Sequence, residues 1–390
     1  MSFDFVSNPV FRDRISAWAP QGQQTITTAA GEHIAIGDGA RVDEEGNAYF
    51  TLYAPGAKEV GVAFGIKASR PVWMEKDENG VWRCTVPYDP AFVGPKAFTF
   101  RVDGATVVSP WCPQYYSHGM AINFIEIPDP NTPYVLMRRD VPHGSVVTEY
   151  YWSEPHDDWQ RCLVYLPAGY EKGGEYPVLY LQHGAFENET SWVFNGRANH
   201  ILDNLIADGK AEPMIIVMND GMARADVPRE RGVFNDVFAK SLLESCIPFI
   251  EGKYRVKADK WNRALAGFSM GSMQSSIIGL THTDTFAWVG LLSGFMSRIG
   301  PNADKITVET NPHLAILTDK EKFAKEVKLF YRAIGSEDPH FDAYAKDDAY
   351  IRENGYDRYE NLVSRVVEGY PHDWAVLRIQ LADFASRLFK

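Results

Sequence analysis

The sequence predicts an α/β protein in which an N-terminal antiparallel β-sandwich precedes a domain built on a largely parallel sheet. Three observations support this prediction. Short β-type runs separated by turn residues fill the first third of the chain, a proline-rich segment follows near residue 130, and apolar runs then alternate with helical patterns. With 390 residues, of which 45% are hydrophobic, the chain is long enough for two or three packed domains.

The predicted sandwich covers residues 1–130. Its strand candidates are 48–53, 59–64, 81–86 and 97–102, and turns such as DENG and DG separate them. The segment IPDPNTP at 127–133 contains too many prolines for a central strand or a helix. We therefore expect a linker over residues 131–145.

Residues 146–390 carry the alternating pattern of the second domain. The strand candidates are 178–182, 214–218, 264–268, 287–292, 327–334 and 362–367. The helix candidates are 198–207, 237–254, 272–280 and 375–388. Such alternation predicts a mostly parallel sheet with helices on both faces.

One pentapeptide in this domain, Gly267-Phe268-Ser269-Met270-Gly271, has the form G-x-S-x-G. It lies between a strand candidate and a helix candidate, which is the context of the nucleophile elbow in α/β-hydrolases. The two glycines let the strand and the helix approach each other closely, while the serine adopts a strained backbone conformation. Ser269 is therefore the predicted nucleophile.

A serine hydroxyl needs a base to accept its proton and an acid to orient that base. In α/β-hydrolases the acid and then the histidine follow the serine, each after a strand. His372 follows the last strand candidate, and Asp338 follows the preceding one, with Glu337 as an adjacent alternative. The other histidines after Ser269 are expected at the surface: His282, His313 and His340.

Ester hydrolysis also needs N–H donors for the tetrahedral oxyanion. One donor is expected from the backbone of Met270, the residue after the nucleophile. The loop after the strand at 178–182 is expected to supply the other, from Ala185 or Phe186. His183 in the same loop is expected to be structural.

The formal charge of −12 and the lack of a lysine- or arginine-dense stretch exclude nucleic acid and anionic membranes as expected partners. The first residues contain neither a basic region nor an apolar core of a signal peptide, so we expect a cytoplasmic protein. The four cysteines are scattered and suggest no zinc site or disulfide framework. The predicted chemistry requires no metal or organic cofactor.

The second domain resembles carbohydrate esterase family 1, the feruloyl and acetyl-xylan esterases of the esterase D type. Besides the elbow, the likeness is carried by 140–144 (DVPHG), 176–184 (YPVLYLQHG), 196–207 (GRANHILDNLIA), 213–218 (PMIIVM), 247–256 (IPFIEGKYRV) and 372–374 (HDW). The resemblance implies an α/β-hydrolase fold. It also implies that Ser269, Asp338 and His372 are the nucleophile, acid and base.

The first domain resembles the immunoglobulin-like, glycogen-binding-type carbohydrate module that is often joined to such esterases. Residues 54–60 (APGAKEV), 74–77 (MEKD) and 100–104 (FRVDG) carry this likeness. Several aromatic residues are candidates for stacking on sugar, with a packing role as the alternative: Trp73, Trp82, Trp111, Tyr115 and Tyr116.

The resemblance implies a serine carboxylic-ester hydrolase that releases hydroxycinnamate from acylated plant cell-wall oligosaccharides, as in xylan degradation. Trp192 and Trp374 are expected to line the pocket, with packing as the alternative. An acetyl-xylan esterase, an enterochelin-type siderophore esterase and an acyltransferase remain open. So do a non-enzymatic glycan-binding protein with an inactive site and a homodimer.

Overall fold

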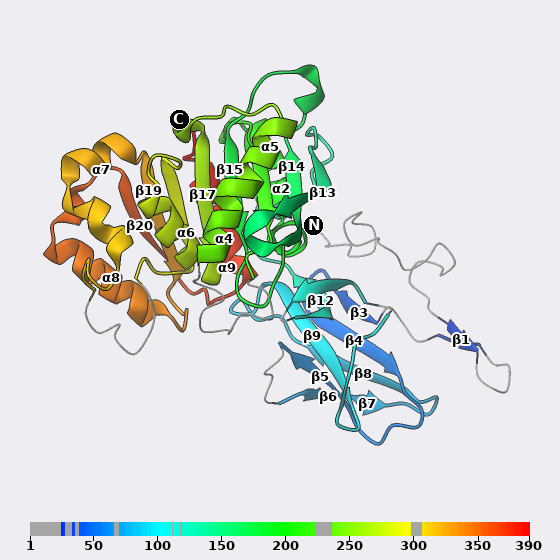
Figure 1. Cartoon of the computed structure of the whole chain (residues 1–390). Coiled ribbons are helices and arrows are strands. Elements are labelled where there is room, and N and C mark those ends of the chain that lie inside the picture. The colour runs from blue at the N-terminus through cyan, green and yellow to red at the C-terminus, as the bar shows by residue number, and fades with distance from the viewer. Residues whose placement is uncertain are drawn as a thin grey trace. The chain divides into compact units, whose positions relative to one another are not determined.

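The computed structural model describes residues 25–27, 33–35, 39–65, 70–110, 112–117, 119–222, 236–297 and 306–390. The chain divides into two compact units, Met1–Asn131 and Thr132–Lys390 (Figure 1). Among the described residues, no helix combines the length and the apolar character that crossing a bilayer would need. Trp111 lies outside the described residues.

The described part of the first unit consists of antiparallel strands and contains no helix. One sheet has the order β3 (Ala40–Val42), β4 (Ala48–Tyr53), β8 (Val81–Val86), β7 (Glu75–Lys76). The other has the order β11 (Gln114–Ser117), β12 (Met120–Ile127), β9 (Gly94–Val102), β5 (Val60–Phe64), β6 (Val72–Trp73), with β10 (Ala105–Val107) paired to β9. A separate pair joins β1 (Thr25–Thr27) and β2 (His33–Ala35).

Buried aromatic rings connect the two larger sheets of this unit. Phe50 of β4 packs edge-to-face on Phe98 of β9 and on Phe64 of β5, at centroid distances of 5.0 and 5.6 Å. Phe50 and Phe98 are fully buried, as the alternating pattern of the strands requires. This β-rich arrangement is consistent with the immunoglobulin-like module, and the four predicted strands coincide with or overlap β4, β5, β8 and β9.

The second unit contains an eight-stranded sheet whose last six strands in spatial order are parallel, as predicted. The order is β13 (Ser145–Ser153), β14 (Asp158–Leu166), β16 (Ile215–Asn219), β15 (Val178–Gln182), β17 (Arg263–Phe268), β18 (Trp288–Leu292), β19 (Leu329–Gly335), β20 (Leu362–Val367). The hairpin β13–β14 is antiparallel to its neighbours within the sheet and was not predicted.

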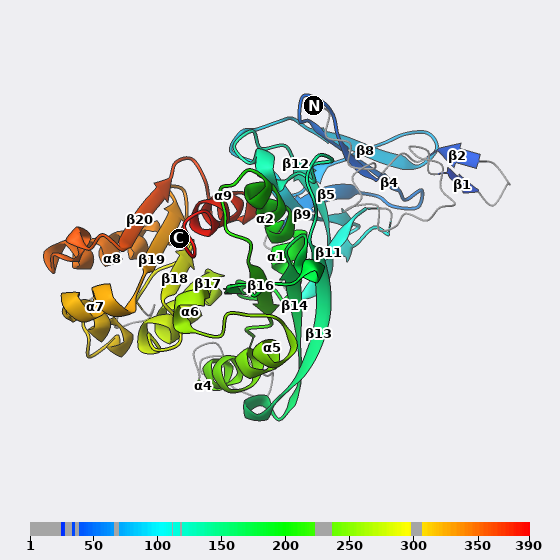
Figure 2. The same ribbon diagram turned by 90° about the horizontal axis from the view of Figure 1, so that it is seen from above.

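Helices cover both faces of this sheet (Figure 2). On one face α4 (Asp236–Lys240), the π-helical turn η4 (Ser241–Cys246) and α5 (Ile247–Lys253) bury apolar residues of β14, β15 and β16. Beside them lie α6 (Met270–Thr281), α7 (Lys320–Glu326) and α8 (Phe341–Glu353). The other face carries α1 (Ser191–Phe194), α2 (Ala198–Ala207) and α9 (Trp374–Ala385). Neighbouring strand residues show the two faces: Phe330 packs in the α6–α8 cluster, whereas Tyr331 packs on Phe384 of α9.

The segment predicted as a linker is packed against α2. Its short helix η1 (Pro133–Val135) is held by the Asn204 side chain, which donates to the carbonyls of Tyr134 and Leu136 at 2.6 and 2.8 Å. The Gly144 N–H donates to Asp203 Oδ1 at 2.9 Å. Residues 132–144 therefore belong structurally to the second unit, whose first strand starts at Ser145.

Candidate active site

The G-x-S-x-G segment forms a tight turn between β17 and α6. Ser269 has φ 52° and ψ −108°, a conformation that side chains with a Cβ rarely adopt, and its side chain is partly exposed. A Cβ on Gly267 would lie 2.4 Å from the Gly271 backbone, and one on Gly271 would lie 2.6 Å from the His183 carbonyl oxygen. Glycine is thus required at both positions for the strand and the helix to meet.

The predicted acid and base lie in contact. His372 Nδ1 is 2.6 Å from Asp338 Oδ2, and the other oxygen of Asp338 accepts the His340 N–H at 2.8 Å. Asp338 is buried, whereas Glu337 is exposed. Since Nδ1 donates to the carboxylate, Nε2 of His372 is left as a proton acceptor. Of the two acids considered, Asp338 is the one that contacts the histidine.

The His372 ring lies beside the nucleophile turn. It packs on Phe268, the residue before Ser269, with ring centroids 4.8 Å apart. It also contacts His340 edge-to-face, with ring centroids 5.0 Å apart. Partial burial and the neighbouring His372 lower the pKa of His340.

Among the described residues, Asp338, His340 and His372 also form a set whose ligand atoms lie within 4.8 Å of one another. These types can bind a divalent cation. However, the 2.6 Å contact between His372 and Asp338 already uses one atom of each, which suits proton transfer better than metal ligation.

His340 and His313 were expected at the surface, and this expectation is wrong. His340 is half-buried against His372. His313 is buried, and its Nε2 lies 2.7 Å from the Met296 carbonyl oxygen. His340 also contacts Phe295, a residue after β18, at 5.7 Å, and sequence spacing does not reveal such packing.

The predicted oxyanion donors lie on two adjacent elements. Met270 is the first residue of α6, where backbone N–H groups are unpaired within the helix. Ala185 and Phe186 lie in the β15–α1 loop (residues 183–190), and both are exposed. Phe186 has φ 65°, and 40% of its surface is accessible.

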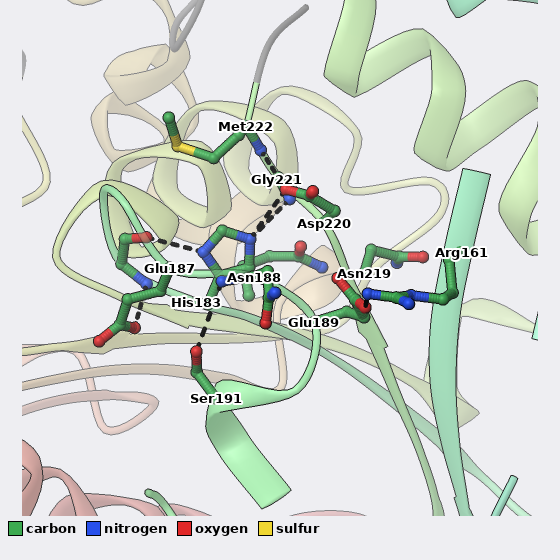
Figure 3. A network of polar contacts seen from close by, with 12 residues as sticks. Arg161, His183, Glu187, Asn188, Glu189, Ser191, Asn219, Asp220, Gly221 and Met222 are labelled. Atoms are coloured by element: carbon green, nitrogen blue, oxygen red, sulfur yellow. Dashed lines mark hydrogen bonds and ion pairs between the residues drawn. The ribbon is translucent and has the colours of Figure 1, made fainter. Parts of the chain in front are cut away.

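His183 joins the β15–α1 loop to the loop after β16 (Figure 3). Its Nδ1 lies 2.7 Å from the Gly184 carbonyl oxygen, while its Nε2 accepts the Gly221 N–H at 2.9 Å and lies 3.2 Å from Asp220 Oδ1. The ring is buried. This is the arrangement of a structural histidine.

Glu187 ties the β15–α1 loop to the segment that carries His372. One carboxylate oxygen accepts the Gly184 N–H at 3.3 Å, and the other accepts the indole N–H of Trp374 at 3.0 Å. Burial raises the pKa of Glu187 to about 7. Glu187 was not among the predicted site residues, because its partner Trp374 is distant in the chain and only the composition of the loop points to it.

Trp192 and Trp374 have packing roles, contrary to the expectation that they line a pocket. Trp192 is 1% exposed and donates its indole N–H to the Gln182 carbonyl at 2.8 Å. Trp374 is buried, stacks edge-to-face on Trp192 at 5.0 Å and contacts Phe268 at 5.6 Å. Both indole N–H groups are paired and both rings are covered, so the two tryptophans pack against the β15–α1 loop and stabilise it.

The aromatic candidates of the first unit separate into two groups. Trp82 and Tyr115 are buried, and the Trp82 indole donates to the Ala54 carbonyl at 2.9 Å. Trp73 and Tyr116 are exposed, and Trp73 lines a cavity of about 580 Å³ together with Tyr49. Packing therefore accounts for the first two residues, while the exposed pair stays available for a ligand.

Comparison with known proteins agrees with this geometry. Residues 157–375 match the family model described as "Putative esterase". The chain is 36% identical over 358 residues to an endo-1,4-beta-xylanase/feruloyl esterase of Xylanibacter ruminicola, covering 90% of this chain and 46% of that protein. The chain thus spans about half the length of this curated relative, and smaller shares of others.

Solved structures show the same fold. A ferulic acid esterase is 27% identical with a TM-score of 0.51, over 63% of this chain and 97% of its own. The enterobactin esterase from Shigella flexneri is 16% identical with a TM-score of 0.60, over 94% of this chain and 96% of its own. The α/β-hydrolase fold is thereby confirmed. Because the esterase model spans more than half of the chain and includes the elbow, this protein belongs to the esterase family.

Proposed function

We propose that this chain is a serine esterase that releases hydroxycinnamate from feruloylated oligosaccharides of plant cell walls. The observation that carries the proposal is the 2.6 Å contact between His372 and Asp338 beside the strained turn of Ser269. The relative named as a xylanase/feruloyl esterase supports the choice of substrate, since it matches nearly the whole chain at 36% identity.

In the proposed mechanism Ser269 Oγ attacks the ester carbonyl carbon, and His372 Nε2 takes the hydroxyl proton. The imidazolium that forms is stabilised by the carboxylate of Asp338, which its own hydrogen bonds keep in place. The N–H of Met270, with that of Ala185 or Phe186, donates to the oxyanion. Collapse of the tetrahedral intermediate breaks the ester C–O bond, and the imidazolium protonates the leaving sugar hydroxyl.

The acyl-enzyme is then hydrolysed by the same groups. His372 removes a proton from water, the resulting hydroxide attacks the acyl carbon, and Ser269 leaves with the proton returned by the imidazolium. Both halves need one base that faces the ester and one carboxylate behind it. No step requires a group beyond those of the chain and water.

The test is hydrolysis by the wild-type chain and by Ser269→Ala. We expect the variant to lose at least about 10,000-fold in kcat/KM on methyl ferulate, with an unchanged melting temperature, because the serine supplies the nucleophile. A serine-directed fluorophosphonate should label the wild type and not the variant. Hydrolysis retained by Ser269→Ala would refute the assignment.

A second candidate is hydrolysis of a trilactone siderophore. It is favoured by the enterobactin esterase structure, which matches both units of this chain over 94% of its length, although at 16% identity. Assaying methyl ferulate, p-nitrophenyl acetate and a trilactone siderophore in parallel separates the candidates. A feruloyl esterase should have its highest kcat/KM on the hydroxycinnamate ester.

A further inference from the structure

Three large aromatic side chains near the tip of the β13–β14 hairpin face solvent. Tyr150, Trp152 and Trp159 are 57%, 41% and 62% exposed. Trp152 and Trp159 are directly opposite each other in the hairpin, with edge-to-face rings at a centroid distance of 5.9 Å. Exposed rings of this size are costly to leave in water, and when clustered they mark binding surfaces. We call these three residues the aromatic shelf.

The shelf lies on a single face of the hairpin. Tyr150 is opposite Arg161 just as Trp152 is opposite Trp159, and residues two apart on a strand share a face. The intervening residues point the other way. Tyr151 stacks on Phe249 of α5, and the Ser153 hydroxyl donates to that of Ser241 at 2.8 Å. The core of the unit thus uses the opposite face and leaves the shelf uncovered.

Strand register places the shelf at the catalytic edge of the sheet. The last pair between β14 and β16 joins Cys162 to Asn219, so Trp159 extends three residues beyond this edge. Ser269 extends two residues beyond Gly267, the last residue of β17 that pairs with β15. Trp159 and Ser269 thus extend about equally far beyond the carboxyl ends of the parallel strands. Their strands β14 and β17 are three strand spacings apart, about 14 Å.

The shelf is also connected to the β15–α1 loop. Arg161, on the same face as the shelf, forms an ion pair with Glu189 of that loop (Figure 3). The Glu189 side chain is buried and that of Arg161 is half-exposed. The same loop carries the exposed ring of Phe186. Its first residue lies against the nucleophile turn, since a Cβ on Gly271 would lie 2.6 Å from the His183 carbonyl oxygen. Contacts thus connect the shelf, through Arg161 and Glu189, to the loop that borders the turn of Ser269.

We infer that the aromatic shelf is a glycan subsite that binds the sugar chain of a xylo-oligosaccharide ester while its acyl carbonyl lies at Ser269. This inference rests on the proposed function. The C–H faces of pyranose rings carry slight positive charge and stack on the negative faces of aromatic rings, while the hydroxyls stay in water. A methyl ester carries no sugar and does not reach the shelf.

A glycan fits the shelf better than a second copy of the chain does. The exposed parts of three such rings amount to roughly 300 Å², given 150–250 Å² for each aromatic side chain. A stable protein interface needs about 800 Å² from each partner. A narrow line of rings ending at a catalytic edge matches a linear sugar chain.

The test compares two substrates in the full-length chain: methyl ferulate and a feruloylated arabinoxylo-oligosaccharide. Trp159→Ala should raise KM for the oligosaccharide about tenfold with kcat unchanged, and should leave both constants for methyl ferulate unchanged. The matched control is Trp261→Ala, since Trp261 is 40% exposed but precedes β17 at the opposite end of the sheet. The control should change neither substrate.

Three results would overturn the subsite. They are an unchanged KM for the oligosaccharide, an equal loss on both substrates, and a wild-type dimer that Trp159→Ala dissociates in sedimentation. A separate titration of Ser269→Ala with unesterified xylo-oligosaccharide keeps the subsite testable if no feruloyl ester is hydrolysed. Adding Trp159→Ala should weaken that binding about tenfold. Equal affinities would reject the subsite, whereas absent hydrolysis with weakened binding would reject only the proposed function.

Discussion

Asp338 satisfies the requirements of the orienting acid because both of its oxygens are occupied. One faces His372 at 2.6 Å and the other accepts the His340 N–H, so the carboxylate cannot rotate without losing a bond. Glu337 is adjacent in sequence, yet it is exposed, and its Oε1 accepts the Ser336 hydroxyl at the long distance of 3.4 Å. A one-residue difference on this turn therefore separates a buried partner of the base from a solvated side chain.

Asp338→Asn should lower kcat about 1,000-fold to 10,000-fold, because an amide neither stabilises the imidazolium nor enforces the correct tautomer. Glu337→Gln is the matched control and should remain within about threefold of the wild type. Steady-state rates on methyl ferulate at pH 7 to 8 measure both. The assignment of the acid would be reversed if Glu337→Gln were the damaging change.

Glu187 makes stability depend on pH. Its folded pKa of about 7 lies above the ordinary 4.5, so the folded chain keeps a proton that the unfolded chain releases. The unfolding free energy therefore falls as pH rises from 4.5 to 7, by about 3 kcal/mol for this group. Glu187→Gln does not ionise and should be spared this loss.

Urea unfolding of both proteins at pH 4.5, 6 and 7.5 measures this effect. The wild type should lose about 3 kcal/mol relative to Glu187→Gln across this range. The substitution also replaces one accepting oxygen by an amide, which offsets the two curves by a constant amount. Parallel curves would show that Glu187 has the same pKa in the folded and unfolded chains.

At the scale of elements, the elbow depends on contact between backbones. The strand β17 and the helix α6 meet where Gly267 faces Gly271. The backbone at the end of β15 lies against Gly271, where an added Cβ would be 2.9 Å from the Gln182 carbonyl oxygen. Hydrogen bonds from the Ser272 N–H and hydroxyl to the Ser269 carbonyl, at 3.1 and 2.6 Å, hold the turn. These contacts hold Ser269 in its strained backbone conformation.

Gly271→Ala should destabilise the chain by about 1–3 kcal/mol and reduce kcat, since the added Cβ would lie 2.6 Å from the His183 carbonyl. Gly252→Ala provides the comparison, because Gly252 lies in α5 with no atom within 4 Å of an added Cβ. It should be up to about 1 kcal/mol more stable than the wild type. Denaturant midpoints measure both, and equal effects would contradict the close-approach argument.

At the scale of the whole molecule, each unit has its own core. The clusters of buried residues around β14–β17 and around β18–β19 consist only of residues after 132. The proposed catalytic residues, the β15–α1 loop and the aromatic shelf also come from this unit. The first unit has a separate set of buried aromatic side chains.

A chain reduced to residues 132–390 should therefore fold and hydrolyse methyl ferulate with a kcat/KM within about threefold of the full chain. Circular dichroism and steady-state kinetics test this. Insolubility together with lost activity would mean that the first unit stabilises the second. A fully folded but inactive fragment would mean that the first unit contributes to the site.

Several features of this chain follow from local patterns of residues. The strand–helix alternation, the G-x-S-x-G turn and the positions of Asp338 and His372 after successive strands could be read directly, because each depends on neighbouring residues. Three other features emerge only from the folded chain: β13–β14 borders the sheet, Glu187 accepts the indole N–H of Trp374, and Trp192 and Trp374 are packing residues. The physical reason is that these features depend on strand register and on contacts between residues far apart in the chain, which local periodicity does not specify.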